Sequence, residues 1–150
     1  MADSTDVLIG DPNAQHVLIR PLGRRHPGLF DSSDGNWIDC DLQITVGGFG
    51  AGFRVDLRSE EFLSFLDDVR GLIQALEGTA SFTTMEGQLA LYLTGDGKGH
   101  VRVSGEAKDD PGSSNRLQFA FDIDQTSLDP VARSLEHLLA SYPVLDGADA

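Results

Sequence analysis

Two pairs of carboxylates stand two residues apart in segments where apolar and polar residues alternate. Asp39 and Asp41 lie in WIDCDLQITV, and Asp122 and Asp124 lie in NRLQFAFDID. Because side chains two apart on a β-strand share a face about 7 Å apart, each pair could act as general acid and base on a sugar. Such chemistry needs a deep cleft with aromatic platforms. The chain has one tryptophan and two tyrosines, so we disfavour a glycosidase.

Other residues that could carry catalysis or hold a cofactor lack the required setting. Cys40 is in phase with the apolar residues of its segment, where a thiol would be inert. The four histidines, His16, His26, His100 and His137, share no face and show no metal-ligand spacing. The segment GGFGAG lacks the lysine of a phosphate-binding loop and lies between two expected strands. We therefore predict no catalytic residue, no metal, no cofactor and no enzyme activity.

The charge of the chain restricts its partners. Twenty-four acidic residues against eleven basic ones give a net charge of −13. Phosphate backbones and anionic membrane surfaces would repel such a chain, whereas cationic partners would be attracted. We therefore predict no nucleic-acid and no membrane binding. Two alternatives stay open from the sequence: the acidic residues only keep the protein soluble, or the source organism lives in high salt.

The carboxylates at 39 and 41 depend on a hairpin for their position. In WIDCDLQITV the period is two, with the apolar side chains Ile38, Cys40, Leu42, Ile44 and Val46 on one face and Trp37, Asp39, Asp41, Gln43 and Thr45 on the other. Gly47 and Gly48 favour a tight turn, and the alternation resumes through residues 49–57. The segment predicts an antiparallel hairpin with one buried face and one solvent-exposed face, which we call the wet face.

Two helices and further strands complete the prediction. Apolar residues at spacings of three and four predict two helices. The first covers residues 59–77, with Ser59 as its N-cap and Gly78 as its stop. The second covers about residues 129–141 and begins at Asp129 and Pro130. Residues 5–22 favour a short hairpin and residues 23–35 a surface loop. Four more strands follow in TASFTTM, QLALYLTG, HVRVSGEAK and NRLQFAFDID, separated by turn residues.

Together these elements predict an α+β fold. We expect an antiparallel meander of six or more strands, with the two amphipathic helices packed on one face. We find no internal repeat and no long linker, so residues 1–150 are expected to form a single domain, disordered at 1–4 and 145–150. A single cysteine and an acidic N-terminus without a signal-peptide pattern favour the cytoplasm.

The wet face offers a surface for recognition. If the strands form one sheet, Trp37, Asp39 and Asp41 would lie near Arg54 and Asp56, with Asp122 and Asp124 further along. An acidic field around a large aromatic is suited to docking a basic protein. The alternative is that a solvated sheet face is simply polar. Trp37, Asp39, Asp41, Asp122 and Asp124 are the partner-binding candidates, with Glu86 and Glu106 as outsiders.

Most of the chain also resembles a known family. Residues 36–142 resemble the WapI-like immunity proteins. The segments that carry the resemblance are, in order, NWIDCDLQITVGGFGAGF, EEFLSFLDDVRGL, LEGTASFTTMEGQLALYLTGDGKGHVRVSG, NRLQFAFDIDQTSL and a closing leucine-rich helix. These are small bacterial proteins encoded beside contact-dependent toxins. The resemblance implies a cytoplasmic antitoxin that binds a cognate toxin domain, often a basic nuclease, and neutralises it without catalysis.

Two other functions stay open from the sequence. The same carboxylates around a pocket would suit a small-molecule or carbohydrate-binding module, or a weak hydrolase. A structural subunit that self-associates through an edge strand is a third reading. A concave pocket with convergent carboxylates would favour the ligand-binding function, and a broad acidic face would favour protein docking.

Overall fold

The fold consists of four strands and a helix, in an order that occurs twice along the chain. The structure is a computed structural model that describes residues 4–28 and 33–145. The first unit comprises β1 (Val7–Gly10), β2 (His16–Arg24), the 3₁₀ turn η1 (Ser33–Asn36), β3 (Trp37–Val46), β4 (Phe49–Arg58) and α1 (Ser59–Ala75). The second comprises β5 (Glu77–Thr83), β6 (Leu89–Asp96), β7 (His100–Lys108), β8 (Arg116–Asp124), η2 (Gln125–Ser127) and α2 (Leu128–Ser141).

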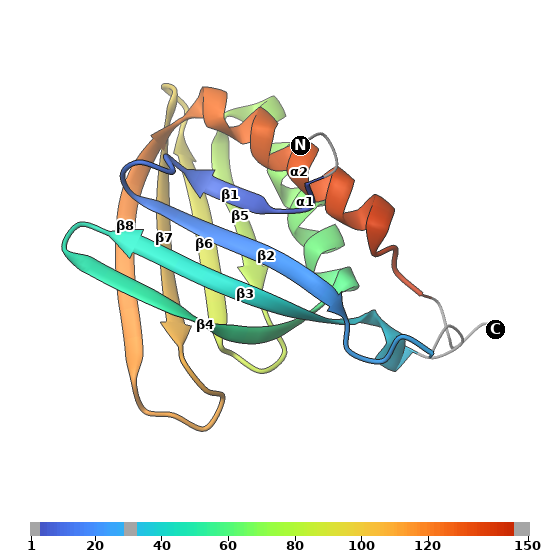
Figure 1. Cartoon of the computed structure of the whole chain (residues 1–150). Helices are drawn as coiled ribbons and strands as arrows, with labels where there is room; N and C mark the ends of the chain where they lie inside the picture. Colours follow the sequence, from blue (N-terminus) through green and yellow to red (C-terminus); the bar gives the residue numbers. More distant parts are fainter. Residues whose placement is uncertain (1–3, 29–32, 146–150) are drawn as a thin grey trace.

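The eight strands form two antiparallel sheets. The strand orders are β1-β2-β3-β4 and β5-β6-β7-β8, so each sheet is a meander. Figure 1 shows one sheet lying across the other, with both helices on one side of the strands. The α+β class, the antiparallel strands and the two helices are confirmed, and the eight strands are divided equally between two sheets. Consequently the carboxylates of β3 and those of β8 belong to different sheets.

The core lies where the apolar faces of the sheets and helices meet. The predicted phase of β3 is confirmed, because Ile38, Cys40, Leu42, Ile44 and Val46 are all buried. Burial raises the pKa of the Cys40 thiol far above its usual range, and nearby carboxylates raise it further, which keeps the thiol protonated and unreactive. None of the helices in the described parts of the chain is long and apolar enough to cross a membrane.

The helices pack on one end of each sheet. Helix α1 contacts β5, helix α2 contacts β1, and the two helices contact each other. Strands β4 and β8 are the outer strands at the opposite ends of the sheets. Among the described residues no further strand pairs with either of them, so each has one unpaired edge.

Helix α1 begins at residue 59 as predicted, but its cap residue and its C-terminal end differ from the prediction. Ser59 is the buried first residue of the helix and Arg58 occupies the cap position, while the Glu61 carboxylate supplies the capping contacts. Its oxygens accept hydrogen bonds from Arg58 N at 2.9 Å, Arg58 Nε at 3.1 Å and Met85 N at 2.7 Å. The helix ends at Ala75, its C-cap residue Leu76 has the left-handed conformation, and Gly78 already lies in β5. Glu61 therefore joins the end of β4, the start of α1 and the β5–β6 turn.

The remaining boundaries are close to those expected. Helix α2 begins one residue early, at Leu128, and its cap position is held by Ser127 instead of Asp129. Strand β2 extends into the expected loop as far as Arg24. At the C-terminal end, Leu145 N donates to Asn36 Oδ1 at 2.6 Å, and Asn36 Nδ2 donates to Leu145 O at 3.1 Å. The expected disorder at 1–3 and 146–150 falls outside the described residues.

Replacing Glu61 by alanine should destabilise the fold by about 3 kcal/mol, because it removes a buried carboxylate and leaves its donors without a partner. Urea unfolding followed by circular dichroism measures this loss. Asp67→Ala removes an exposed carboxylate from the same helix and should change the free energy of unfolding by less than about 0.5 kcal/mol. Equal effects of the two substitutions would show that Glu61 is not a special contact.

Candidate functional site

A hollow rich in carboxylates lies along the unpaired side of β4. Its volume is about 340 Å³, and we call it the acidic hollow. The residues that line it are Arg25, Asp39, Arg54, Val55, Asp56, Glu86, Gln88, Asp109, Asp110 and Pro111. Five carboxylates thus face two guanidinium groups, so the hollow carries an excess of negative charge.

Hairpin register brings Asp39 and Asp56 together. Strands β3 and β4 are joined by Gly47 and Gly48, and this turn sets Asp39 directly opposite Asp56. Both side chains are on the outer face of the sheet, because the intervening residues point to the core. Arg25, just after β2, is held beside them by a backbone hydrogen bond of 2.9 Å from its N–H to Trp37 O.

The opposite wall of the acidic hollow comes from two turns of the second sheet. Glu86 and Gln88 lie in the β5–β6 turn, and residues 109–111 lie in the β7–β8 turn. Gln88 is buried; its backbone oxygen accepts from Lys108 N at 2.8 Å, and its Nε2 donates to Lys108 O at 3.3 Å. These bonds fix the β5–β6 turn to the end of β7, so the carboxylates of both turns keep their positions relative to each other.

The electrostatics of the acidic hollow centre on Asp56. Burial raises the pKa of its carboxyl, a hydrogen bond with the Asp39 carboxyl raises it further, and the Arg25 guanidinium opposes both. Arg25 forms an ion pair with Asp56, and its Nη1 lies 3.8 Å from Asp39 Oδ1. One arginine is therefore shared between two carboxyls, so the five carboxylates of the hollow outnumber its two guanidinium groups.

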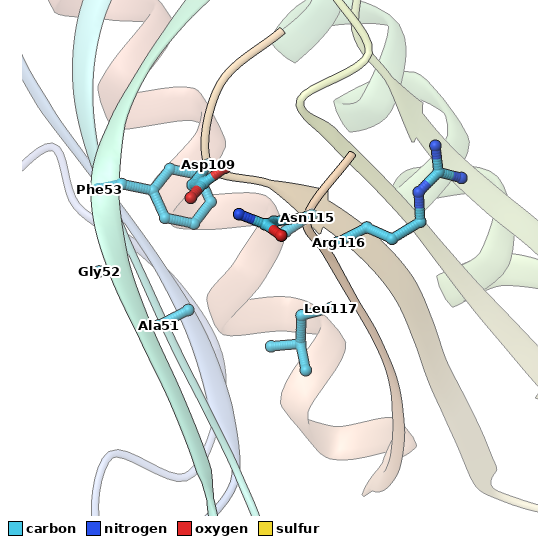
Figure 2. A pocket seen from close by; sticks show the side chains of 8 residues that line it. Ala51, Gly52, Phe53, Asp109, Asn115, Arg116 and Leu117 are labelled. Carbon is cyan, nitrogen blue, oxygen red and sulfur yellow. The ribbon is translucent and has the colours of Figure 1, made fainter. Parts of the chain in front are cut away.

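A second, apolar cavity continues from the acidic hollow along β4. Its volume is about 320 Å³, and it is lined by Ala51, Gly52, Phe53, Ala107, Asp109, Asn115, Arg116 and Leu117. Figure 2 shows Ala51 and Phe53 on one side and Leu117 on the other, while Arg116 points away. Asp109 lines both spaces. We call the acidic hollow and this apolar cavity together the β4 groove.

The chain matches a known protein family over most of its length. The immunity protein WapI-like family matches residues 7–143. The chain belongs to this family. The match includes β1 and β2, which lie outside the resemblance noted over residues 36–142. No curated protein matches the chain.

Solved structures provide further similarities for this WapI-like chain. One is the Trypanosoma brucei MRP1/MRP2 structure, with a TM-score of 0.45 and 12% identity over 92% of this chain and 84% of that chain. Another is a CdiA-CT/CdiI toxin and immunity complex from Enterobacter cloacae, with a TM-score of 0.43 and 10% identity over 87% and 97% of the two chains.

The structure brings three of the five predicted site residues of this WapI-like chain together. Trp37, Asp39 and Asp41 are half-buried on the outer face of β3. The Arg58 guanidinium lies 5.7 Å from the centre of the Trp37 ring, and Arg54 Nε lies 3.8 Å from Asp41 Oδ1. Trp37 thus packs against the residue that precedes α1, and only Asp39 of the three lines the acidic hollow.

The other two predicted residues lie on the second sheet. Asp122 Oδ1 accepts from Arg102 Nη1 at 3.2 Å. Asp124 caps η2 by accepting from Thr126 N at 3.0 Å and Thr126 Oγ1 at 2.8 Å, and these bonds lower the pKa of its carboxyl. Asp124 therefore has a structural partner within its own turn, and the expected single acidic face is divided between two sheets.

Several residues of the acidic hollow were not among the site candidates. The sequence places Asp56 near Asp39, although Asp56 was not chosen as a candidate, and the two-residue turn at 47–48 sets the two directly opposite each other. Asp109 and Asp110 carry no local signal, since their position depends on how the two sheets pack. In residues 4–28 and 33–145 no group of three or more His, Cys, Asp and Glu side chains could hold a metal ion.

The pKa of Asp56 should respond to its neighbours in opposite directions. Asp39→Asn should lower it by removing a raising neighbour, whereas Arg25→Gln should raise it further. Carbon-13 NMR titration of the carboxyl group measures both shifts, with Asp41→Asn as a control that leaves the pKa unchanged. Because the folded pKa exceeds 3.8, the contribution of Asp56 to the free energy of unfolding should fall as pH rises from 3.8 through the folded pKa. An unchanged pKa in Asp39→Asn would contradict the pairing.

Proposed function

We propose that this protein is an antitoxin that binds a basic toxin domain through the acidic hollow and neutralises it without catalysis. Membership of the immunity protein WapI-like family supports the antitoxin role. The observation that carries the choice of surface is the excess of carboxylates in one concave site. The site would act in the cytoplasm, where an incoming toxin domain has to be blocked.

Electrostatics favour a cationic partner for this surface. The chain carries a net charge of −13, and the acidic hollow concentrates five carboxylates around two arginines. A complementary potential of this kind raises the association rate by about 10- to 1,000-fold at low salt. A lysine or arginine entering the hollow would also relieve the repulsion between Asp39 and Asp56. Domains that act on nucleic acids are basic for a related reason, because they hold phosphates.

A small-molecule or carbohydrate-binding function is the second candidate. The specific observation in its favour is the convergence of Asp39 and Asp56 in a hollow of about 340 Å³, where the pKa of Asp56 is raised. Calorimetry with the toxin domain encoded beside this chain, and separately with neutral and amino sugars, distinguishes the two functions. Binding of the toxin with loss of its activity supports the antitoxin, whereas binding of a sugar alone supports the second candidate.

Reversing two charges of the acidic hollow should slow toxin binding. The double variant Glu86→Lys and Asp109→Lys should reduce the association rate constant by about tenfold or more at low salt, with a smaller effect at 0.5 M salt. The control Asp67→Lys and Glu77→Lys makes the same change in net charge away from the hollow, at exposed sites on α1 and β5. Stopped-flow kinetics measure both. Equal slowing would show that net charge, and not this surface, governs association.

A further inference from the structure

The unpaired edge of β4 exposes backbone groups at known positions. Val46 and Phe49 close the two-residue turn, so alternate residues 49, 51, 53, 55 and 57 bond to β3. The N–H and C=O groups of Gly50, Gly52, Arg54 and Asp56 therefore point away from the sheet. Arg58 agrees with this alternation, because its N–H also points away from β3 and donates to the Glu61 carboxylate at 2.9 Å. Residues 50–56 thus form a row of backbone donors and acceptors beside the β4 groove.

The first part of this edge, residues 49–53, lacks the usual protection against pairing. Native edge strands carry charged side chains, prolines or bulges that prevent another strand from adding. The segment FGAGF, residues 49–53, has no charge and no proline, and its pairing with β3 is regular. Gly50 and Gly52 have no positive φ, and a Cβ at Gly52 would meet no atom within 4 Å. The fold itself does not require glycine there.

The β4 groove next to this edge has two chemically different parts. Beside Ala51 and Phe53 it is apolar, and Leu117 closes it on the far side. Beside Arg54 and Asp56 it becomes the acidic hollow. Phe49, at the tip of the hairpin, is 69% exposed and shares the face of β4 that carries Ala51 and Phe53. A strand lying along this edge would direct alternate side chains to opposite faces of the sheet, one set toward the apolar cavity and the other toward the outer face that carries Asp39 and Asp56.

We infer that the free edge of β4, from Gly50 to Asp56, pairs with an extended strand of the toxin domain in which apolar residues alternate with lysine or arginine. This inference rests on the proposed function and adds the mode of binding. Backbone hydrogen bonds supply affinity, and the two parts of the β4 groove select the alternating side chains. The seven residues span about 20 Å, enough for a strand of ordinary length. A second copy of the chain fits poorly, because its net charge of −13 would meet the same acidic hollow.

Amide hydrogen exchange tests the pairing residue by residue. In the free protein the amides of Gly50, Gly52 and Arg54 should exchange rapidly, and those of Ala51, Phe53 and Val55 slowly. On adding an inactivated form of the toxin domain encoded beside this chain, the first set should become protected at least tenfold. Complex formation without that protection overturns strand pairing but leaves the antitoxin function standing. Absence of any complex contradicts the proposed function itself.

Substitution of Gly52 gives a second, independent test. Gly52→Pro removes the outward N–H without removing a bond to β3, and it should weaken toxin binding by about tenfold or more. Gly52→Ala keeps the N–H and has free space for its Cβ, so binding should stay within about twofold. Circular dichroism and thermal unfolding check that both variants fold. Equal binding by the two variants overturns the inference, and if Gly52→Pro does not fold, the exchange pattern decides.

Discussion

The buried carboxylate of Glu61 is the contact on which the geometry of the groove depends. It accepts bonds from Arg58, where β4 ends, and from Met85 N at 2.7 Å, in the turn between β5 and β6. Since β4 belongs to one sheet and the β5–β6 turn to the other, this one side chain ties the two sheets together at the start of α1. A buried carboxylate is stable only when donors surround it, so the turn that carries Glu86 is held where those donors meet.

The contact of Glu61 with both sheets also determines what lies beside the outer strand β4. The helices pack against β1 and β5, and within residues 4–28 and 33–145 the strands at the opposite ends of the sheets, β4 and β8, keep unpaired edges. Glu61 and the Gln88–Lys108 bonds then hold two turns of the second sheet beside the edge of β4. The groove is therefore formed by contacts between the sheets, although each of its walls is a simple hairpin.

The difference between what the sequence predicts and what it does not follows from the range of each interaction. The period of two in β3 and the stripe of α1 are local patterns, and the structure confirms both. The predicted start of α1 at residue 59 is confirmed, but the predicted cap is wrong by one residue, because Ser59 has the usual capping chemistry while Arg58 holds the cap position and the decisive contacts come from Glu61. Its third donor, Met85, lies 24 residues away. The division into two sheets and the approach of Asp109 to Asp56 likewise depend on packing that no local pattern encodes.

Three carboxylates of the chain, Asp56, Asp96 and Asp124, differ in the groups that surround them. Asp124 accepts two bonds from Thr126 and Asp96 accepts bonds from Lys98 N and His100 N, and these bonds lower the pKa of both groups. Their negative charge is already stabilised by the turns in which they lie. The pKa of Asp56 shifts the other way, through burial and its contact with Asp39, although Arg25 is beside it. Because burial and the neighbouring Asp39 disfavour the charged form of Asp56, an incoming cation would stabilise the acidic hollow more than the turns that hold Asp96 and Asp124.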